Sequence, residues 1–248
     1  MKTALVTGAA HRLGAELARF FAQDGHRVII HANSSITEAA ALVASLEASG
    51  HEAIAFAADL TDEASVAQFV DQVIAAAGVP DIIVNNASVF DYDAPGTVDL
   101  DRLRKSFEVH AVAPILIMEA AVRRRRLDQS LAIFNILDQK LLNLNPDYFS
   151  YTIGKAALHA ATQLWQARDM PGVRVFGILP GLLFPSGGQT SERYGQDVKK
   201  SPLQKPVTAR AIYDAIAFFI RNENIKGQDL AVDGGENLTG RKRDVAFE

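Results

Sequence analysis

The chain has 248 residues, of which 48% are hydrophobic and 22% are charged, and this is the composition of a globular protein rather than a disordered one. It contains no cysteine, which excludes disulfides, thiolate metal sites and a cysteine nucleophile. The formal net charge of −4 gives no overall attraction to nucleic acid or to an anionic membrane. Because no apolar run is long enough to span a bilayer and no basic leader begins the chain, we expect a cytoplasmic protein.

Short apolar runs and helical periodicities alternate along the whole chain. The predicted strands are 4–6, 28–30, 53–57, 81–84, 131–137, 174–179 and 228–232. The predicted helices are 12–24, 38–48, 63–77, 103–125, 150–167 and 208–221. We expect Pro114 to bend the long fourth helix and Thr208 to cap the last one. Apolar strands separated by helices predict a parallel sheet covered on both faces, within a single α/β domain over residues 1–248.

The stretch from Pro180 to Pro206 shows neither periodicity and is rich in glycine and proline. A loop of such length in a compact protein is usually functional, and this one directly follows a strand at the carboxyl edge of the sheet. We therefore predict that residues 182–205 form a substrate loop, in preference to a surface excursion without a function.

A glycine-containing turn between the first strand and the first helix predicts a phosphate site. Glycine removes the Cβ that would hold the backbone away from a pyrophosphate, and the helix that follows offers unpaired N–H groups. The Gly-x5-Gly spacing is a weaker signal than a three-glycine fingerprint, because any turn of this kind can use glycine. The predicted cofactor-binding residues of this turn are Gly8, His11, Arg12, Leu13 and Gly14.

The turn after the second strand indicates which dinucleotide binds. A site for NAD usually places an acidic residue here, on the ribose 2′-hydroxyl. Ser34 and Ser35 stand there instead and can donate hydrogen bonds to a 2′-phosphate, which favours NADP(H), although the turn can also be a plain polar loop. Asp59 follows the third strand, where it either accepts from adenine or begins the next helix. The remaining predicted cofactor contacts are Leu60, Asn86, Ala87, Ser88, Pro180 and Gly181.

Tyr151 and Lys155 lie four residues apart at the start of a predicted helix and therefore share one face. An ammonium group near a phenol stabilises the phenolate and lowers its pKa, so we expect Tyr151 to be a usable proton donor. Asp138, just beyond the fifth strand and thirteen residues before Tyr151, gives a second acid/base group and is the third predicted catalytic residue. Tyr148 is excluded as the donor because Thr152 lies four residues after it.

Taken together, these motifs resemble the short-chain dehydrogenase/reductase family over nearly the full length of the chain. The matching pieces are Thr7-Gly8 to Gly14, Asp59, Asn85-Asn86-Ala87, Tyr151-x-x-x-Lys155, Pro180-Gly181 and Gly227-Gln228-x-x-x-Val232-Asp233-Gly234-Gly235. The resemblance implies a Rossmann-like, doubly wound sheet of seven parallel strands with helices on both faces. It also implies hydride transfer from a nicotinamide, with Tyr151 and Lys155 contacting the cofactor and Lys155 holding the nicotinamide ribose.

Three departures from the general family pattern are similar to pteridine reductases and bacterial dihydromonapterin reductases. Arg12 replaces a small residue, Asp138 replaces serine, and Ser88 replaces glycine with Phe90 two residues later. This narrower resemblance implies NADPH-dependent reduction of a pterin C=N bond, with Phe90 stacking on the ring. The implied substrate-binding residues are Arg12, Ser88, Phe90, Asp138, Tyr151 and Leu182. It also implies a homotetramer built on helices near 101–125 and 150–168, with Arg241 reaching a neighbouring subunit.

His110 stands where the family usually has an asparagine that holds a water in the proton relay. A histidine can replace that role, or it can simply be satisfied by a backbone carbonyl within its helix. Two other functions remain open: a reductase of ketones or 3-oxoacyl thioesters on the same scaffold, and a catalytically weak NADP-binding sensor. No metal site is predicted.

Overall fold

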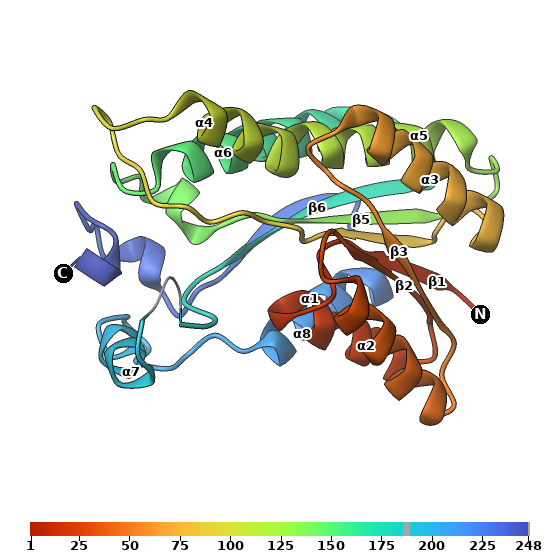
Figure 1. Ribbon diagram of the computed structural model, residues 1–248, viewed down its shortest axis with the longest axis horizontal. Coiled ribbons are helices and arrows are strands. Elements are labelled where there is room, and N and C mark those ends of the chain that lie inside the picture. The colour runs from red at the N-terminus through yellow and green to blue at the C-terminus, as the bar shows by residue number, and fades with distance from the viewer. Residues whose placement is uncertain (186–188, 248) are drawn as a thin grey trace.

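In the computed structural model, which describes residues 1–185 and 189–247, seven parallel strands form one sheet. Their order is β3-β2-β1-β4-β5-β6-β7 (Figure 1). The strands are β1 (Thr3–Val6), β2 (Arg27–Ala32), β3 (Ala53–Ala57), β4 (Ile82–Asn85), β5 (Leu131–Ile136), β6 (Val173–Pro180) and β7 (Gly227–Val232). This confirms the predicted doubly wound, Rossmann-like sheet, whose order reverses between β1 and β4.

Helices cover both faces of the sheet (Figure 1). They are α1 (Arg12–Gln23), α2 (Ile36–Ala48), α3 (Glu63–Ala77), α4 (Leu100–Phe107), α5 (Ala113–Arg124), α6 (Phe149–Ala167), α7 (Ser191–Val198) and α8 (Ala209–Arg221). The α1, α2 and α8 helices pack on one face and α3, α5 and α6 on the other. Successive strand residues face opposite layers, since Ala4 and Val6 join one apolar cluster and Leu5 the other. Both faces are therefore buried, which explains the continuous apolar strands.

The predicted long helix is interrupted by a π-helical turn, Glu108–Val112, between α4 and α5. The backbone N–H of Ala113 donates to the carbonyl of Glu108, five residues back. Pro114 has no N–H and its ring clashes with a carbonyl four residues back, so the wider turn accommodates it. The break thus lies before Pro114 and is a wider turn rather than a simple bend.

The stretch predicted to be irregular contains a helix, α7, so that part of the prediction is wrong. Thr190 caps it, because its hydroxyl accepts from the N–H of Arg193 at 3.2 Å. The buried Asp197 holds its end through Lys200, at 2.8 Å, and Arg193, at 3.4 Å. Residues 186–188 of the predicted substrate loop lie outside the described residues.

The carboxyl ends of all seven strands meet at one edge, where α7 and the C-terminal segment also lie (Figure 1). The described residues also form four short 3-10 and π turns: Glu108–Val112 (η1), Gln139–Leu142 (η2), Glu236–Leu238 (η3) and Val245–Phe247 (η4). Within the described part of the chain, none of the helices combines the length and the apolar character that a membrane span requires. The residues predicted to act on a cofactor and a substrate gather at this carboxyl edge.

Candidate active site

The turn between β1 and α1 is shaped to admit a pyrophosphate. Gly8 has a φ of +62°, and a Cβ on it would lie 2.8 Å from the Cα of Ala87. A Cβ on Gly14 would lie 2.4 Å from the carbonyl oxygen of Gly8. The cap residue of α1, His11, makes no side-chain hydrogen bond to the first turn, so the N–H groups there face the turn without a competing cap. The arrangement fits the phosphates of a dinucleotide.

Asn86 and Thr7 join this turn to the end of β4. The Asn86 amide donates to the carbonyls of Thr7 (2.9 Å) and Gly8 (3.2 Å). The Thr7 hydroxyl oxygen accepts from the backbone N–H groups of Asn86 (2.9 Å) and Ala87 (3.0 Å). The predicted contact residues Asn86 and Ala87 are thus placed beside the glycine turn, and Thr7 is a supporting residue that the sequence analysis did not single out.

His31, at the end of β2, is a second supporting residue that was missed. Its Nδ1 accepts from the N–H of Gly8 at 3.1 Å, and its Nε2 lies 3.1 Å from the carbonyl of Ala58. The ring therefore carries its proton on Nε2, and burial lowers its pKa, which keeps it neutral. Its position within an apolar strand hid this role in the sequence.

Arg12 begins α1 with a φ of +51° and reaches across to the segment after β6. Its Nη2 donates to the carbonyl of Pro185 at 2.9 Å, and its guanidinium lies over the ring of Phe184. The backbone carbonyl of Leu182, in the same segment, accepts a hydrogen bond from the Tyr194 hydroxyl of α7 at 3.1 Å. Arg12 therefore joins the glycine turn to the segment after β6, the segment that also contains Leu182.

The other predicted cofactor contacts have mixed environments. Ser34 and Ser35, the predicted contacts of a 2′-phosphate, lie in the turn between β2 and α2, and the Ser35 hydroxyl makes no capping hydrogen bond to α2. The Asp59 carboxylate accepts from the backbone and the hydroxyl of Thr61, which lower its pKa, and α3 is capped by Asp62 instead. The Leu13 and Leu60 side chains are buried in the core, which leaves them only backbone groups for a ligand.

Glycine is required beside Pro180, because a Cβ on Gly181 would lie 2.7 Å from the Cα of Asp233. The Gly181 N–H donates to the carbonyl of Val232 at 3.1 Å, which brings the ends of β6 and β7 together. The predicted contacts Pro180 and Gly181 thus lie at the carboxyl end of β6, next to the end of β7.

Tyr151 and Asp138 form a hydrogen-bonded pair. The Tyr151 hydroxyl donates to Oδ2 of Asp138 at 2.6 Å, while Oδ1 accepts from the N–H of Lys140 at 2.8 Å. Burial raises the pKa of Asp138 above its ordinary value. Burial and the neighbouring Asp138 charge raise the pKa of Tyr151 well above its ordinary value. The Tyr151 phenol therefore keeps its proton and donates it in a hydrogen bond to the Asp138 carboxylate.

The expectation that Lys155 lowers the pKa of Tyr151 is wrong for this arrangement. Lys155 donates to the carbonyl of Ile136 at 2.6 Å, and its Nζ lies 5.8 Å from the centre of the Tyr151 ring. Burial lowers the pKa of Lys155 to about 8. The effect of Asp138 on the phenol outweighs that of the ammonium, because the carboxylate is in direct contact with the hydroxyl and the ammonium is not.

Aromatic side chains line the approach to Tyr151. Phe90 stacks on Tyr148 with ring centres 4.1 Å apart and an angle of 19°, and it meets the Tyr151 ring edge-on at 4.8 Å. Phe90 is 42% exposed, so it is accessible to a ligand at this edge of the sheet. Tyr148 adopts a φ of +54° at the residue before α6, and its side chain makes no capping hydrogen bond to that helix.

His110 is held by hydrogen bonds on both ring nitrogens. Nε2 accepts from the N–H of Val89 (3.2 Å) and lies 2.9 Å from the Ser88 hydroxyl, and Nδ1 lies 3.0 Å from Oγ of Ser106. The Ser106 hydroxyl donates to the carbonyl of Ser150, so Nδ1 carries the proton. Burial and the Lys155 charge lower the pKa of His110 well below its ordinary value, so it stays neutral. It fixes Ser88, a predicted cofactor and substrate contact, in place.

The start of α6 is capped from outside the helix by Asp93, a third residue that was missed. Its carboxylate accepts from the backbone N–H of Ser150 at 2.9 Å and from the Ser150 hydroxyl, and its carbonyl accepts from Phe149. Asp93 is buried. Asp93 connects the loop that carries Ser88 and Phe90 to the turn that carries Tyr151. No pattern along the sequence marks this contact, because Asp93 and Ser150 lie 57 positions apart.

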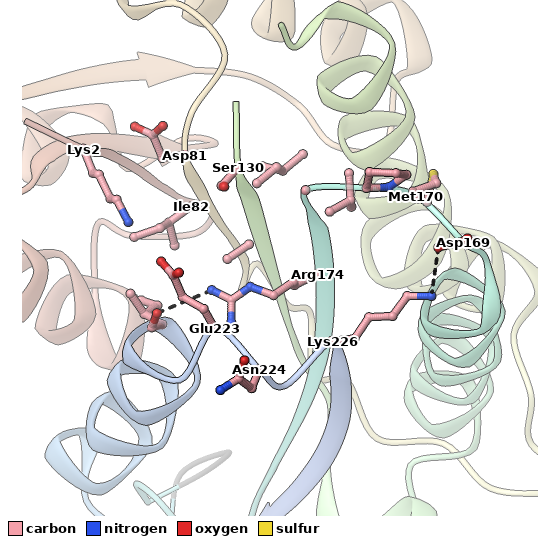
Figure 2. A pocket seen from close by; sticks show the side chains of 16 residues that line it. Lys2, Asp81, Ile82, Ser130, Asp169, Met170, Arg174, Glu223, Asn224 and Lys226 are labelled. Carbon is pink, nitrogen blue, oxygen red and sulfur yellow. Dashed lines mark hydrogen bonds and ion pairs between the residues drawn. The ribbon is translucent and has the colours of Figure 1, made fainter. Parts of the chain in front are cut away.

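Arg241 contacts its own chain, where Nε lies 2.7 Å from Glu236 and Nη2 donates to the Lys200 carbonyl at 2.8 Å. A cavity of about 350 Å³ opens at the opposite, amino edge of the sheet, far from these residues (Figure 2). Arg174, which lines this cavity, donates to the carbonyls of Phe219 (2.8 Å) and Asn222 (3.1 Å) at the end of α8. No group of three or more metal-ligating side chains occurs among residues 1–185 and 189–247.

Comparison with known proteins agrees with this geometry. A family model described as enoyl-(acyl carrier protein) reductase matches residues 8–237. A dihydromonapterin reductase of Klebsiella pneumoniae is 27% identical over 94% of this chain and 96% of its own, and pteridine reductase 1 of Leishmania tarentolae is 29% identical over 95% and 96%. The crystal structure of FolM alternative dihydrofolate reductase 1 from Brucella canis, complexed with NADP, superposes with a TM-score of 0.92 at 34% identity, covering 98% of this chain and 96% of that one. The chain is therefore an oxidoreductase that belongs to the short-chain dehydrogenase/reductase family.

Proposed function

We propose that the protein reduces a pterin-type C=N bond with NADPH. The observation that carries this proposal is the Tyr151–Asp138 hydrogen bond of 2.6 Å beside the partly exposed ring of Phe90. A serine in place of Asp138 suits only the orientation of a ketone oxygen, whereas a carboxyl group can also carry a proton and accept from the N–H groups of an aminopyrimidine. The likeness to dihydromonapterin and pteridine reductases supports the same substrate class.

The protein's residues divide the work of proton transfer and positioning. NADPH supplies the hydride to the carbon of the C=N bond when it is bound. Tyr151 donates the proton to the ring nitrogen and is left as a phenolate. Asp138, which accepts from the Tyr151 hydroxyl in the resting site and whose pKa is raised, takes up a proton from water and passes it to the phenolate oxygen. Lys155 holds the nicotinamide ribose, and Phe90 stacks on the substrate ring while Ser88 orients it.

The cofactor side of the proposal rests on the glycine turn and on Ser34 and Ser35. The N–H groups at the start of α1 hold the pyrophosphate, and Arg12 supplies positive charge beside it. With serines where an acidic residue would repel a 2′-phosphate, NADPH binds more tightly than NADH. The likeness to FolM structures complexed with NADP supports this preference.

The experiment compares NADPH oxidation with dihydropterins and with small ketones, in parallel with fluorescence titration of both cofactors. Tyr151→Phe should lower turnover of dihydropterins by roughly 10²–10⁴-fold, the usual contribution of a positioned acid. It should leave NADPH binding within a few fold of the wild type. Turnover of ketones alone refutes the pterin substrate, and NADPH binding without any turnover favours a sensor. Tighter binding of NADH than of NADPH refutes the role of the two serines.

A further inference from the structure

The C-terminal segment, residues 241–247, is fastened beside the candidate site by one buried carboxylate. Arg243 donates through Nε and Nη2 to the two oxygens of Asp147, each at 2.8 Å. The backbone N–H of Asp244 donates to the same carboxylate at 2.7 Å, and the Tyr92 hydroxyl donates to it at 3.3 Å. Asp147 is only 1% exposed, so its carboxylate charge is shielded from water and is stabilised by these hydrogen-bond donors instead.

Lys140 makes a second set of contacts that holds the same segment. Lys140 donates to the backbone carbonyl of Asp147, and its Nζ lies 3.7 Å from the carboxylate of Asp244. Lys140 follows Asp138 by two residues, and Asp147 precedes Tyr151 by four. The two residues that hold the C-terminal segment therefore lie in the same chain segments as the Tyr151–Asp138 pair. A bidentate guanidinium–carboxylate contact fixes orientation as well as distance.

The fastened segment places Phe247 at the outer end of a row of rings that leads to Tyr151. Its ring centre lies 5.0 Å from that of Tyr92 and 6.1 Å from that of Tyr148, which stacks on Phe90. Phe90, Tyr92 and Phe247 are 42%, 44% and 45% exposed. Such a run of partly exposed rings beside a reactive group is typical of a surface that receives a flat ligand.

We propose that Asp147 is a positioning residue that fixes this segment as the outer wall of the substrate site within the same chain. The wall, formed by Phe247 and Tyr92, limits how large a substituent the substrate can carry on the end that points away from the nicotinamide. The inference rests on the proposed reductase function and adds a determinant of substrate size. The site is thereby closed by a segment about 100 residues downstream of Asp147 in the sequence.

The first test asks whether the fastening exists in solution and needs no substrate. Hydrogen exchange should show protection of the Asp244 amide, which donates to Asp147, and of the Phe247 amide, which donates to Asp244. Arg243→Gln should speed exchange at both amides by about tenfold or more, whereas Arg243→Lys should do so less. Arg123→Gln, which breaks an exposed ion pair within α5, is the control and should leave both amides unchanged. Unprotected amides in the wild type overturn the proposal whatever the substrate is.

The second test measures kcat/KM for a dihydropterin with a methyl group at C6 and for dihydrofolate, whose C6 substituent is much larger. Arg243→Gln and Phe247→Ala should raise the ratio of large to small substrate by about tenfold, mainly through KM, and Arg123→Gln should not change it. An unchanged or lowered ratio in both variants overturns the wall. If the wild type reduces ketones but no pterin, the proposed function fails, and the same ratio measured with a bulky and a small ketone still decides for or against the wall.

Discussion

Replacing Asp93 tests how much a buried helix cap contributes to the stability of the protein. Asp93→Ala removes a cap, which costs about 0.5–2 kcal/mol, and it leaves the buried N–H and hydroxyl of Ser150 without their acceptor, at about 1–3 kcal/mol. The free energy of unfolding should fall by about 1.5–5 kcal/mol, and Tm by roughly 3–20 °C at about 2–4 °C per kcal/mol for a chain of this size.

The matched control is Asp62→Ala, since Asp62 caps α3 through the N–H of Ala64 at 3.0 Å but is exposed. It loses a cap and strands no buried group, so it should cost only about 0.5–2 kcal/mol. Urea unfolding followed by circular dichroism measures both, and slopes that agree with the wild type show that the transition is comparable. Equal losses of stability in the two variants would refute the reasoning, because the burial of Ser150 and Asp93 would then contribute nothing. Asp93→Ala should also reduce turnover, since the capped turn carries Tyr151.

Three further predictions follow from the site. Asp138→Asn should remove the fall in kcat with rising pH, because a carboxyl group of raised pKa delivers its proton only while protonated; a pH profile that keeps this limb would assign it elsewhere. Gly8→Ala should weaken NADPH binding at least about tenfold by pushing on Ala87, whereas Gly25→Ala, with a φ of +80° and open space, should cost stability but not affinity in the same titration. Burial lowers the pKa of Lys155 to about 8, whereas the ordinary pKa of the side chain in an unfolded chain is 10.5. Between these two pH values the unfolded state holds more protons than the folded state, so the free energy of unfolding rises with pH. Urea midpoints from pH 8 to 10.5 should rise less steeply in Lys155→Met, and parallel curves would contradict the lowered pKa.

Sequence reasoning succeeded where one local pattern decides the outcome. The apolar strands and the helical periodicities predicted all seven strands and their order of appearance, and the Thr208 cap is confirmed at 3.1 Å from the N–H of Ala211. It was wrong about α7, whose residues are polar and held by the buried Asp197, so no periodic apolar face marks the helix.

The site residues that sequence reasoning missed act through contacts between distant segments. Thr7 reaches Asn86, 79 positions away, and Asp93 reaches Ser150, 57 positions away. The direction of the Tyr151 pKa shift was also wrong, because helical spacing shows that Lys155 shares a face with the phenol but not that Asp138 lies closer. A pattern along the chain gives the residue types of a site, and the fold decides which of them touch.

The single imidazole of His31 links the ends of β1, β2 and β3 by bonding Gly8 on one side and Ala58 on the other. These strand ends are consequently preorganised by the protein's own atoms, and an arriving nucleotide need not order them. Binding free energy that would otherwise be lost to conformational entropy is retained as affinity. Association is then governed by the orientational search for a rigid groove rather than by a slow rearrangement of the loops around it.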